Sequence, residues 1–285
     1  MGYGDNMEKL KEKLKDLKIG LEVHVKLPTK TKLFCNCPND DNEIENTNIC
    51  PICLGFPGTR PKINRKAIEL TISIAKALNC KLNETFYFSR KVYFYPDLPK
   101  GFQITQHETP IGYNGYLKIS DGKSEKNIRI REVHLEEDAA KIKKAKRNMI
   151  IDFNRSGIPL AEIVTEPDIT SLKQLELFFK ELKNKLRNIG IKEMKIKADV
   201  NVSIFGERVE IKNIDSVETM RKAVIKEILR EYELFKANKP ITRATLHYDK
   251  EKDQIIVARE KETEEDYGYI PEPDLGIFTL DAFLT

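Results

Sequence analysis

The clearest pattern in the chain is an alternation of apolar and polar residues over residues 18–27. Apolar side chains alternate there with Gly20, Glu22, His24 and Lys26, which predicts a half-buried β-strand. Residues two apart on a strand point to the same face, so Glu22 and His24 should project together from the polar face, roughly 7 Å apart along the strand. Each of these two residues could also be an ordinary solvated surface residue.

A predicted hairpin repeats this pattern. Residues 198–204 alternate cleanly, residues 205–207 form a turn, and residues 208–214 alternate again. The polar face of the hairpin therefore carries Asp199 and Glu210 on adjacent strands. Solvent exposure is the usual explanation for such a face, but strand 18–27 presents the same kind of face.

Helices are interspersed with these strands. They are predicted over residues 7–17, 64–79, 172–188 and 216–238, with N-caps at Asn64, at Thr170 or Ser171, and at Ser216. A further hairpin pairs residues 244–248 with 254–258. Mixed helices and antiparallel hairpins predict an α+β fold, with a largely antiparallel mixed sheet and flanking helices.

The densest group of titratable residues is the run His134-Leu-Glu-Glu-Asp138. On a strand, His134, Glu136 and Asp138 share one face, and Glu137 points to the other unless a bulge turns it. Clustered carboxylates repel one another and need positive charge nearby. The cationic side chains Arg129, Arg131 and Lys141 can supply it, and so can a divalent cation.

Composition narrows the class of protein only a little. The chain has 285 residues, 40% of them hydrophobic, with 49 Lys+Arg against 45 Asp+Glu. This predicts a globular protein with a large core, in which any basic surface is local. The N-terminus is charged, and no apolar run approaches the length of a membrane span, so we expect a cytoplasmic protein with no signal peptide.

Four of the five cysteines form two close pairs, a C-x-C pair and a C-x-x-C pair separated by twelve residues. The pairs are Cys35 with Cys37 and Cys50 with Cys53. Two thiolate pairs flanking a polar loop suit tetrahedral zinc, and four cysteines leave no open coordination position, so the zinc would be structural. Reduced surface thiols and disulfides are the alternatives.

The region from residue 86 to residue 106 is unusually aromatic. It places Lys91 beside Tyr93, and its prolines exclude a central strand through residues 96–101. Basic residues interleaved with tyrosines suit phosphate or nucleic acid, and an aromatic packing corner explains the pattern equally well.

Across nearly its whole length the chain resembles the B subunit of the tRNA-dependent amidotransferases. The matching stretches are GLEVHVKL (20–27), LFCNCP (33–38), NTNICPICLGFPG (46–58), RKVYFYPDLPKGFQITQ (90–106), HLEEDAAK (134–141), DFNRSGIPLAEIVTEPD (152–168), ADVNVSI (198–204), RVEIKNI (208–214) and YIPEPDL (269–275). The resemblance implies a catalytic cradle domain over residues 1–285, with a zinc-binding loop at 33–58. It also implies that the helical and tail domains that hold tRNA are absent from this chain.

The resemblance further implies a glutamine-dependent ligase that uses ATP and Mg²⁺. ATP would phosphorylate the side-chain carboxylate of Glu-tRNA(Gln) or Asp-tRNA(Asn), and ammonia from a partner amidase would displace the phosphate. The expected partners are the A subunit, which is the amidase, and the small C subunit. The expected catalytic residues are Glu22, His24, Lys91, Tyr93, Glu136, Glu137, Asp199 and Glu210. Of these, the resemblance assigns Glu22, His24, Glu137 and Glu210 to one Mg²⁺, and Lys91 and Asp199 to the nucleotide.

Departures from the family pattern are few: Ala140, Ile241 and Gly268 stand where other residues are usual. Two other classes of function remain open. One is a zinc-bearing RNA-binding module with a basic patch at residues 143–147. The other is a scaffold protein whose charged face docks a partner enzyme. The RNA-binding module predicts no nucleotide binding and tolerates loss of Glu22 or Glu137, whereas a scaffold interface would be expected to carry exposed apolar residues.

Overall fold

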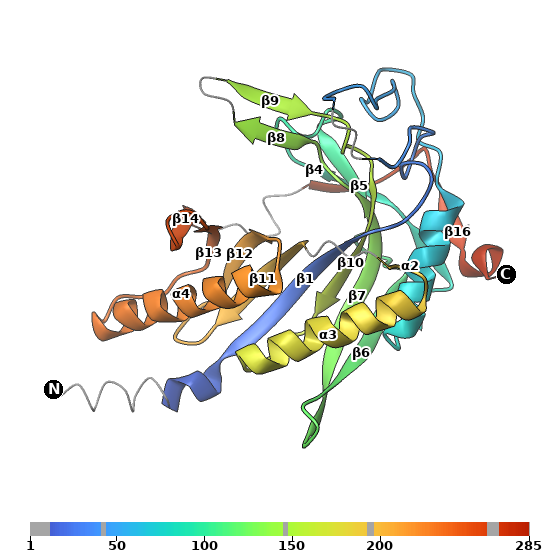
Figure 1. Cartoon of the computed structure of the whole chain (residues 1–285). Coiled ribbons are helices and arrows are strands. Elements are labelled where there is room, and N and C mark those ends of the chain that lie inside the picture. The colour runs from blue at the N-terminus through green and yellow to red at the C-terminus, as the bar shows by residue number, and fades with distance from the viewer. Residues whose placement is uncertain (1–11, 41–43, 145–147, 193–196, 261–267, 285) are drawn as a thin grey trace.

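The computed structural model describes residues 12–40, 44–144, 148–192, 197–260 and 268–284. At its centre lies a curved nine-stranded sheet (Figure 1). Its strands follow the order β14 (Gln254–Glu260), β13 (Ala244–Asp249), β12 (Val209–Ile214), β11 (Lys197–Ser203), β1 (Lys18–Lys26), β10 (Pro159–Thr165), β7 (Glu125–Glu137), β6 (Gly112–Ser120) and β2 (Lys81–Leu82). Neighbouring strands are antiparallel except β12 and β13, which are parallel. The predicted α+β class with a largely antiparallel sheet is confirmed.

Short strands form three smaller sheets around this one. They are β15 (Gly268–Pro271) with β4 (Ser89–Val92) and β5 (Phe102–Thr105), then β16 (Ile277–Thr279) with β3 (Thr85–Tyr87), and β8 (Lys141–Lys144) with β9 (Met149–Asp152). In Figure 1, β4, β5, β8 and β9 lie beyond the upper end of the large sheet. The aromatic region at residues 86–106 therefore forms two short strands joined by a proline-containing loop.

The helices α2 (Arg65–Ala77), α3 (Leu172–Asn188) and α4 (Val217–Lys236) lie along one face of the large sheet (Figure 1). Each begins at a predicted cap. The side chains of Asn64, Ser171 and Ser216 accept a hydrogen bond from the backbone N–H three residues further on, at 3.3, 3.2 and 3.1 Å. The apolar side chains of β1 and those of the helices form one core. The opposite face of the sheet is thereby left for polar side chains.

Some predicted features lie at the edge of the described residues. Of the helix predicted over residues 7–17, residues 12–13 are α-helical and continue into a short 3₁₀ turn, η1 (Leu14–Asp16), while residues 1–11 are outside the described part. A second 3₁₀ turn, η3 (Leu280–Phe283), follows β16. Within the predicted basic patch, the Nζ atom of Lys143 lies 2.5 Å from Glu45 Oε1, and residues 145–147 are not described.

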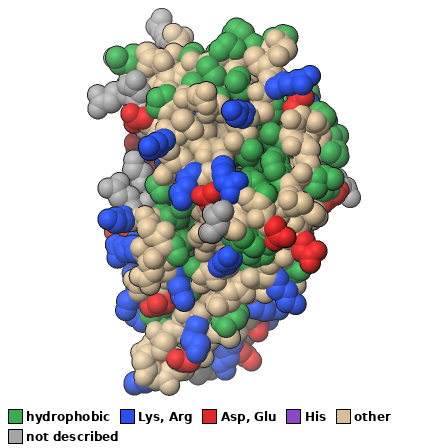
Figure 2. Space-filling view, turned by 90° about the vertical axis from the view of Figure 1, so that its right-hand side faces the viewer, with side chains coloured by type: hydrophobic (Ala, Val, Ile, Leu, Met, Phe, Trp, Pro, Cys, Tyr) green, Lys and Arg blue, Asp and Glu red, His purple; other side chains and the backbone are tan. Residues whose placement is uncertain are grey.

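On the face shown in Figure 2, Lys and Arg side chains are interspersed with Asp and Glu. Among the described residues, no helix combines the length and the apolar character that a membrane span requires.

Helix α4 carries two buried glutamates against the core. Glu227 accepts two hydrogen bonds from the guanidinium of Arg230, both at 2.7 Å. The Oε2 atom of Glu231 accepts from the backbone N–H of Phe205 at 3.1 Å, but its buried Oε1 has no partner among the described residues. Burial raises the pKa of Glu231 to about 8, and the nearby Glu227 adds to this rise. Glu231 is therefore a neutral acid at moderate pH and an unfavourable buried charge at high pH.

We expect Glu231→Gln to stabilise the protein at high pH only. A carboxyl group whose pKa is raised on folding contributes its full stability below its unfolded pKa of 4.5 and loses it as the pH rises through about 8. Glutamine cannot ionise, so at about pH 9 the variant should melt roughly 2–4 °C higher than the parent, which corresponds to about 1 kcal/mol. At about pH 5 this advantage should vanish. Thermal denaturation at both pH values measures it, with the exposed Glu233→Gln on the same helix as control. A difference in melting temperature that does not change with pH would contradict this account.

Candidate functional site

A row of acidic and histidine side chains crosses the polar face of the large sheet. The strand register aligns them: Glu22 on β1 lies opposite Asp199 on β11, and His24 on β1 lies opposite Glu162 on β10. Glu162 in turn lies opposite His134 on β7. Neighbouring strands are only about 4.8 Å apart, so residues distant in sequence meet here. The sequence-based prediction that Glu22 and His24 share a face is confirmed. Strand β10, which lies between β1 and β7, adds Glu162 to the same row.

The first group in this row consists of Glu22, Asp199 and Glu210, whose carboxylate oxygens lie within 4.8 Å of one another. The ammonium of Lys212 lies 2.8 Å from Glu210 and 3.4 Å from Asp199. Burial raises the pKa of Glu22 to about 7, and the negative charges around it act in the same direction. One lysine therefore offsets the charge of three carboxylates only in part, and an additional cation would be favourable here.

The second group consists of His24, Glu136 and Glu162, again with ligand atoms within 4.8 Å of one another. The Nε2 atom of His24 lies 3.4 Å from Glu136 Oε1 and 3.8 Å from Glu162 Oε2. Burial lowers the pKa of His24, but the Glu162 and Glu136 carboxylates outweigh it and raise the pKa to about 10. In the absence of a metal, a protonated histidine thus compensates the two carboxylates. A bound metal ion would take the place of the proton, with the neutral imidazole as one of its ligands, and the charge of the ion would then offset the two carboxylates.

Glu137 does not join either group. Its side chain lies on the other side of β7, where Oε1 pairs with Lys100 and accepts from the backbone N–H of Ile104 at 2.9 Å. The expected convergence of Glu137 with Glu22, His24 and Glu210 is therefore not seen, because successive residues of a strand point to opposite faces. Glu136 occupies that place instead. Glu137 lines a separate cavity of about 190 Å³ together with Lys100 and Cys53.

Two adjoining cavities lie over the polar row, with volumes of about 630 and 250 Å³. Both are lined by Glu22, Lys91, Glu136, Glu162 and Lys212. The larger is also lined by residues that the sequence analysis did not select as site residues. These are Gln106, His134, Arg208 and Arg243, together with Arg131, which had been considered only as a counter-charge.

The predicted nucleotide residues Lys91 and Asp199 both line the smaller cavity. Tyr93, one residue beyond the end of β4, is partly buried and does not line these two cavities of the described structure. Glu162 could have been found from the alternation of residues 159–165, because it is the only charged residue in that strand. Lys212 carries a similar signal, since it follows Glu210 on the polar face of its strand.

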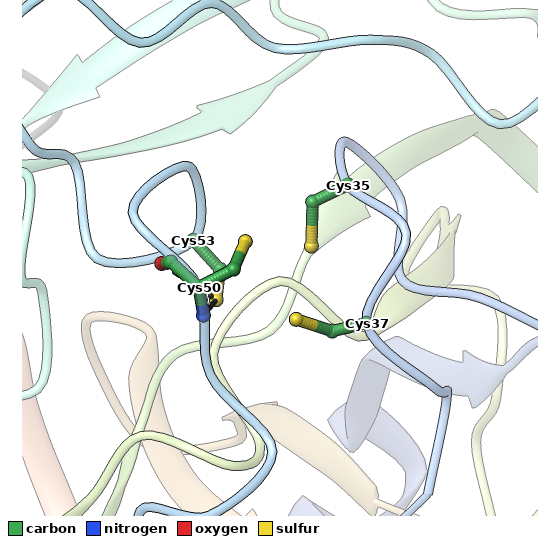
Figure 3. A group of neighbouring side chains, drawn as sticks. All are labelled: Cys35, Cys37, Cys50 and Cys53. Carbon is green, nitrogen blue, oxygen red and sulfur yellow. Dashed lines mark hydrogen bonds between the residues drawn. The ribbon is translucent and has the colours of Figure 1, made fainter.

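The four paired cysteines come together as the sequence predicted (Figure 3). Cys35 and Cys37 come from one loop and Cys50 and Cys53 from another, and all four sulfurs lie within 4.8 Å of one another. All are free thiols, which leaves out the disulfide alternative in this structure. Four converging sulfurs fit the tetrahedral geometry of a structural zinc ion. Cys80, the fifth cysteine, lies just beyond α2 and is not part of the group.

A buried lysine accompanies the cysteine group. Lys32 is completely buried, and its Nζ donates to the backbone carbonyl of Asn48 at 2.9 Å and lies 3.8 Å from Cys53 Sγ. A hydrogen bond from Cys35 is the main cause that lowers the pKa of Cys53, to about 5, and the charge of Lys32 contributes. One thiolate is thus favoured even without metal, and the lysine would offset part of the charge of a tetrathiolate site.

The sheet, its acidic row and the cavities above it form a candidate active site, and comparison with known families identifies the family of the domain. Residues 17–284 match the family described as the GatB/GatE catalytic domain, and the chain belongs to that family.

Several curated relatives are named as the B subunit of aspartyl/glutamyl-tRNA(Asn/Gln) amidotransferase. The chain is 46% identical to the protein of Coprothermobacter proteolyticus over 93% of its own length and 59% of that protein. It is 45% identical to the protein of Methanoregula boonei, over 94% of this chain and 58% of the relative. The chain thus spans less than two thirds of the length of these relatives.

We expect about one zinc ion per chain at the cysteine group, because its geometry matches a tetrathiolate site. Elemental analysis of the purified protein should find this metal, and the double substitution Cys50→Ser, Cys53→Ser should remove it and lower the melting temperature. Metal coordination orders such loops by several kcal/mol. Cys80→Ser serves as the control and should retain the metal. A metal-free parent protein that melts at the same temperature as the double variant would refute the assignment.

Proposed function

We propose that this chain is the catalytic domain of a tRNA-dependent amidotransferase. In this proposal ATP phosphorylates the side-chain carboxylate of Glu-tRNA(Gln) or Asp-tRNA(Asn), and ammonia then converts it to the amide. The observation that carries the proposal is the acidic row beneath a cavity of about 630 Å³ in a member of the GatB/GatE catalytic domain family. The name of the relatives agrees with this substrate class.

The chemistry explains why ATP is needed. A carboxylate cannot be amidated directly, because hydroxide is a poor leaving group, whereas an acyl phosphate loses inorganic phosphate readily. In the first step a carboxylate oxygen attacks the terminal phosphorus of ATP and ADP leaves. In the second step ammonia attacks the acyl carbon, phosphate leaves, and one proton must be removed from the nitrogen. A nearby carboxylate that does not bind the metal is suited to accept that proton.

The two acidic groups are suited to hold Mg²⁺. Glu22, Asp199 and Glu210 provide hard oxygen ligands, and His24, Glu136 and Glu162 provide oxygens and one imidazole. When bound there, Mg²⁺ would offset the charge of the ATP phosphates and orient them. Lys91 and Lys212 line both cavities and would hold the same phosphates from the sides. The metal role of Glu137 stays a prediction from the family resemblance, since its carboxylate pairs with Lys100 here.

This domain needs partners for the complete reaction. We propose that the A subunit, an amidase, releases ammonia from glutamine and that the small C subunit completes the assembly. Regions beyond the part of the relatives that this chain matches would hold the tRNA. The cavity between the cysteine loop and Glu137 is bounded by Lys100, and it borders the strand that carries Glu136. The structural zinc would keep the wall of this cavity in place.

We expect divalent-metal binding to depend on the first acidic group and on pH. Asp199→Asn should weaken Mn²⁺ or Mg²⁺ binding on the order of 10-fold or more, because it removes a charged oxygen ligand. Affinity in the parent chain should rise from about pH 6 to about pH 8 as Glu22 ionises. Calorimetric titration of this chain measures both effects. Glu137→Gln is the matched control, since its carboxylate lies outside the group. Equal weakening by both substitutions would favour the assignment that includes Glu137.

We also expect the acidic row to be needed for transamidation in the assembled enzyme. Glu22→Gln keeps the size of the side chain and removes its charge, so ATP-dependent phosphorylation of the aminoacyl-tRNA should fall by orders of magnitude. Glutamine hydrolysis by the amidase partner should be much less affected. Radiolabelled phosphate transfer and ammonia release measure the two reactions separately. Near-normal transamidation by Glu22→Gln with intact tRNA binding would overturn the catalytic proposal and favour an RNA-binding or scaffold role.

A further inference from the structure

A buried amide whose NH₂ group makes no hydrogen bond lines the larger cavity. Gln106 follows β5 directly, is 3% exposed and lines the cavity. Its Oε1 accepts a hydrogen bond from the backbone N–H of Leu135 at 3.0 Å. Because the amide NH₂ group cannot accept a hydrogen bond from an N–H, this contact fixes which end of the amide is the oxygen. The Nε2 group, which carries two donors, has no acceptor among the described residues. A buried donor without an acceptor costs about 1–3 kcal/mol.

A second buried atom without a hydrogen-bond partner belongs to His134, which precedes Leu135 on β7. The Nε2 atom of His134 lies 2.8 Å from Glu162 Oε2, and its Nδ1 has no hydrogen-bond partner in the described structure, with Glu132 Oε1 at 3.8 Å. Because Gln106 is bound to the backbone of Leu135, the next residue, both unsatisfied atoms belong to the same wall of the cavity. Two such atoms in one wall indicate that this wall is built to contact a polar ligand.

The arginine side chains that line the same cavity, alongside its carboxylates, indicate the kind of ligand. Arg131, Arg208 and Arg243 line the same cavity, and neither Arg208 nor Arg243 forms an ion pair within the described residues. Arg131 forms one ion pair within the described residues, with Nε at 3.8 Å from Glu166 Oε1. Amide donors and guanidinium groups together suit oxygen atoms that carry negative charge. Thr105, next to Gln106, donates to Glu136 Oε2 at 3.2 Å, so such a ligand would lie beside the second acidic group.

We propose that Gln106 is the central donor of a binding site for an oxyanion, with its Nε2 group contacting an oxygen of the reacting substrate. This inference rests on the proposed function, in which two oxyanions enter this cavity: the terminal phosphate of ATP and the side-chain carboxylate of the aminoacyl group. Both have the chemistry that the wall recognises. Gln106 acts by binding and positioning this oxygen, and it takes no part in proton transfer.

Gln106→Glu tests the proposal with little structural change. One oxygen of the glutamate can still accept from Leu135, while the other replaces the donor with a negative charge. The probes are the Mg²⁺ complex of a non-hydrolysable ATP analogue and N-acetylglutamate α-methyl ester, which carries the side-chain carboxylate. We expect Gln106→Glu to weaken binding of one probe on the order of 10- to 100-fold, as loss of a hydrogen bond to a charged group predicts. Gln174→Glu on α3 makes the same change in charge away from the cavity and should bind as the parent does.

The side-chain amide of Gln106 gives a second readout in the unmodified chain. Its ¹⁵N–¹H signals, assigned by their loss in Gln106→Glu, should shift on saturation with the probe that occupies the site. The probe that shifts them decides between phosphate and carboxylate. Unchanged affinity in Gln106→Glu, or an amide signal that neither probe moves, would overturn the proposal. If the probes do not bind as expected, divalent-metal binding by the same protein distinguishes two explanations. If the metal binds normally, only the proposed role of Gln106 is wrong. If the metal does not bind, the proposed function is wrong as well.

Discussion

The electrostatic balance on the polar face of the large sheet governs the rest of this structure. Six side chains that can bind a metal, five of them carboxylates, lie in two groups on adjacent strands. Such a concentration of negative charge is unfavourable unless cations lie close by. The protein supplies some of them itself, with Lys212 against one group and the protonated His24 and His134 within the other. The residual charge makes the site able to attract a divalent cation.

The fold makes this balance possible by fixing the positions of the carboxylates. Strand β1 lies in the middle of the sheet and contributes Glu22 to one group and His24 to the other. The apolar side chains of the same strand are buried against the core that the helices complete. Each polar side chain is therefore held by a backbone that cannot move without exposing apolar surface. A rigid sheet is a suitable base for a site whose carboxylates would otherwise move apart.

The adjacent residues Glu136 and Glu137 show how one strand serves two sites. Glu136 faces the acidic row, and Glu137 faces the cavity bordered by the cysteine loop. Their partners differ accordingly, with histidines around Glu136 and Lys100 beside Glu137. The strand therefore separates the cavity over the acidic row from the cavity that the cysteine loop borders.

The local structure of this chain could be predicted from its sequence, because helices and strands follow from periodicity and capping. The alternation over residues 18–27, the caps at Asn64, Ser171 and Ser216, and the spacing of the cysteines are short-range signals, and each was confirmed in the structure. The alternation rule also predicted that Glu137 would face away from Glu136. Only the tertiary structure decided which strands are neighbours. That order places Glu162 between His24 and His134, and it brings Arg208 and Arg243 to the cavity. These contacts depend on pairing between strands that are distant in sequence, from 28 residues for His134 and Glu162 to 138 for His24 and Glu162, and no short stretch of sequence carries a signal for such pairing.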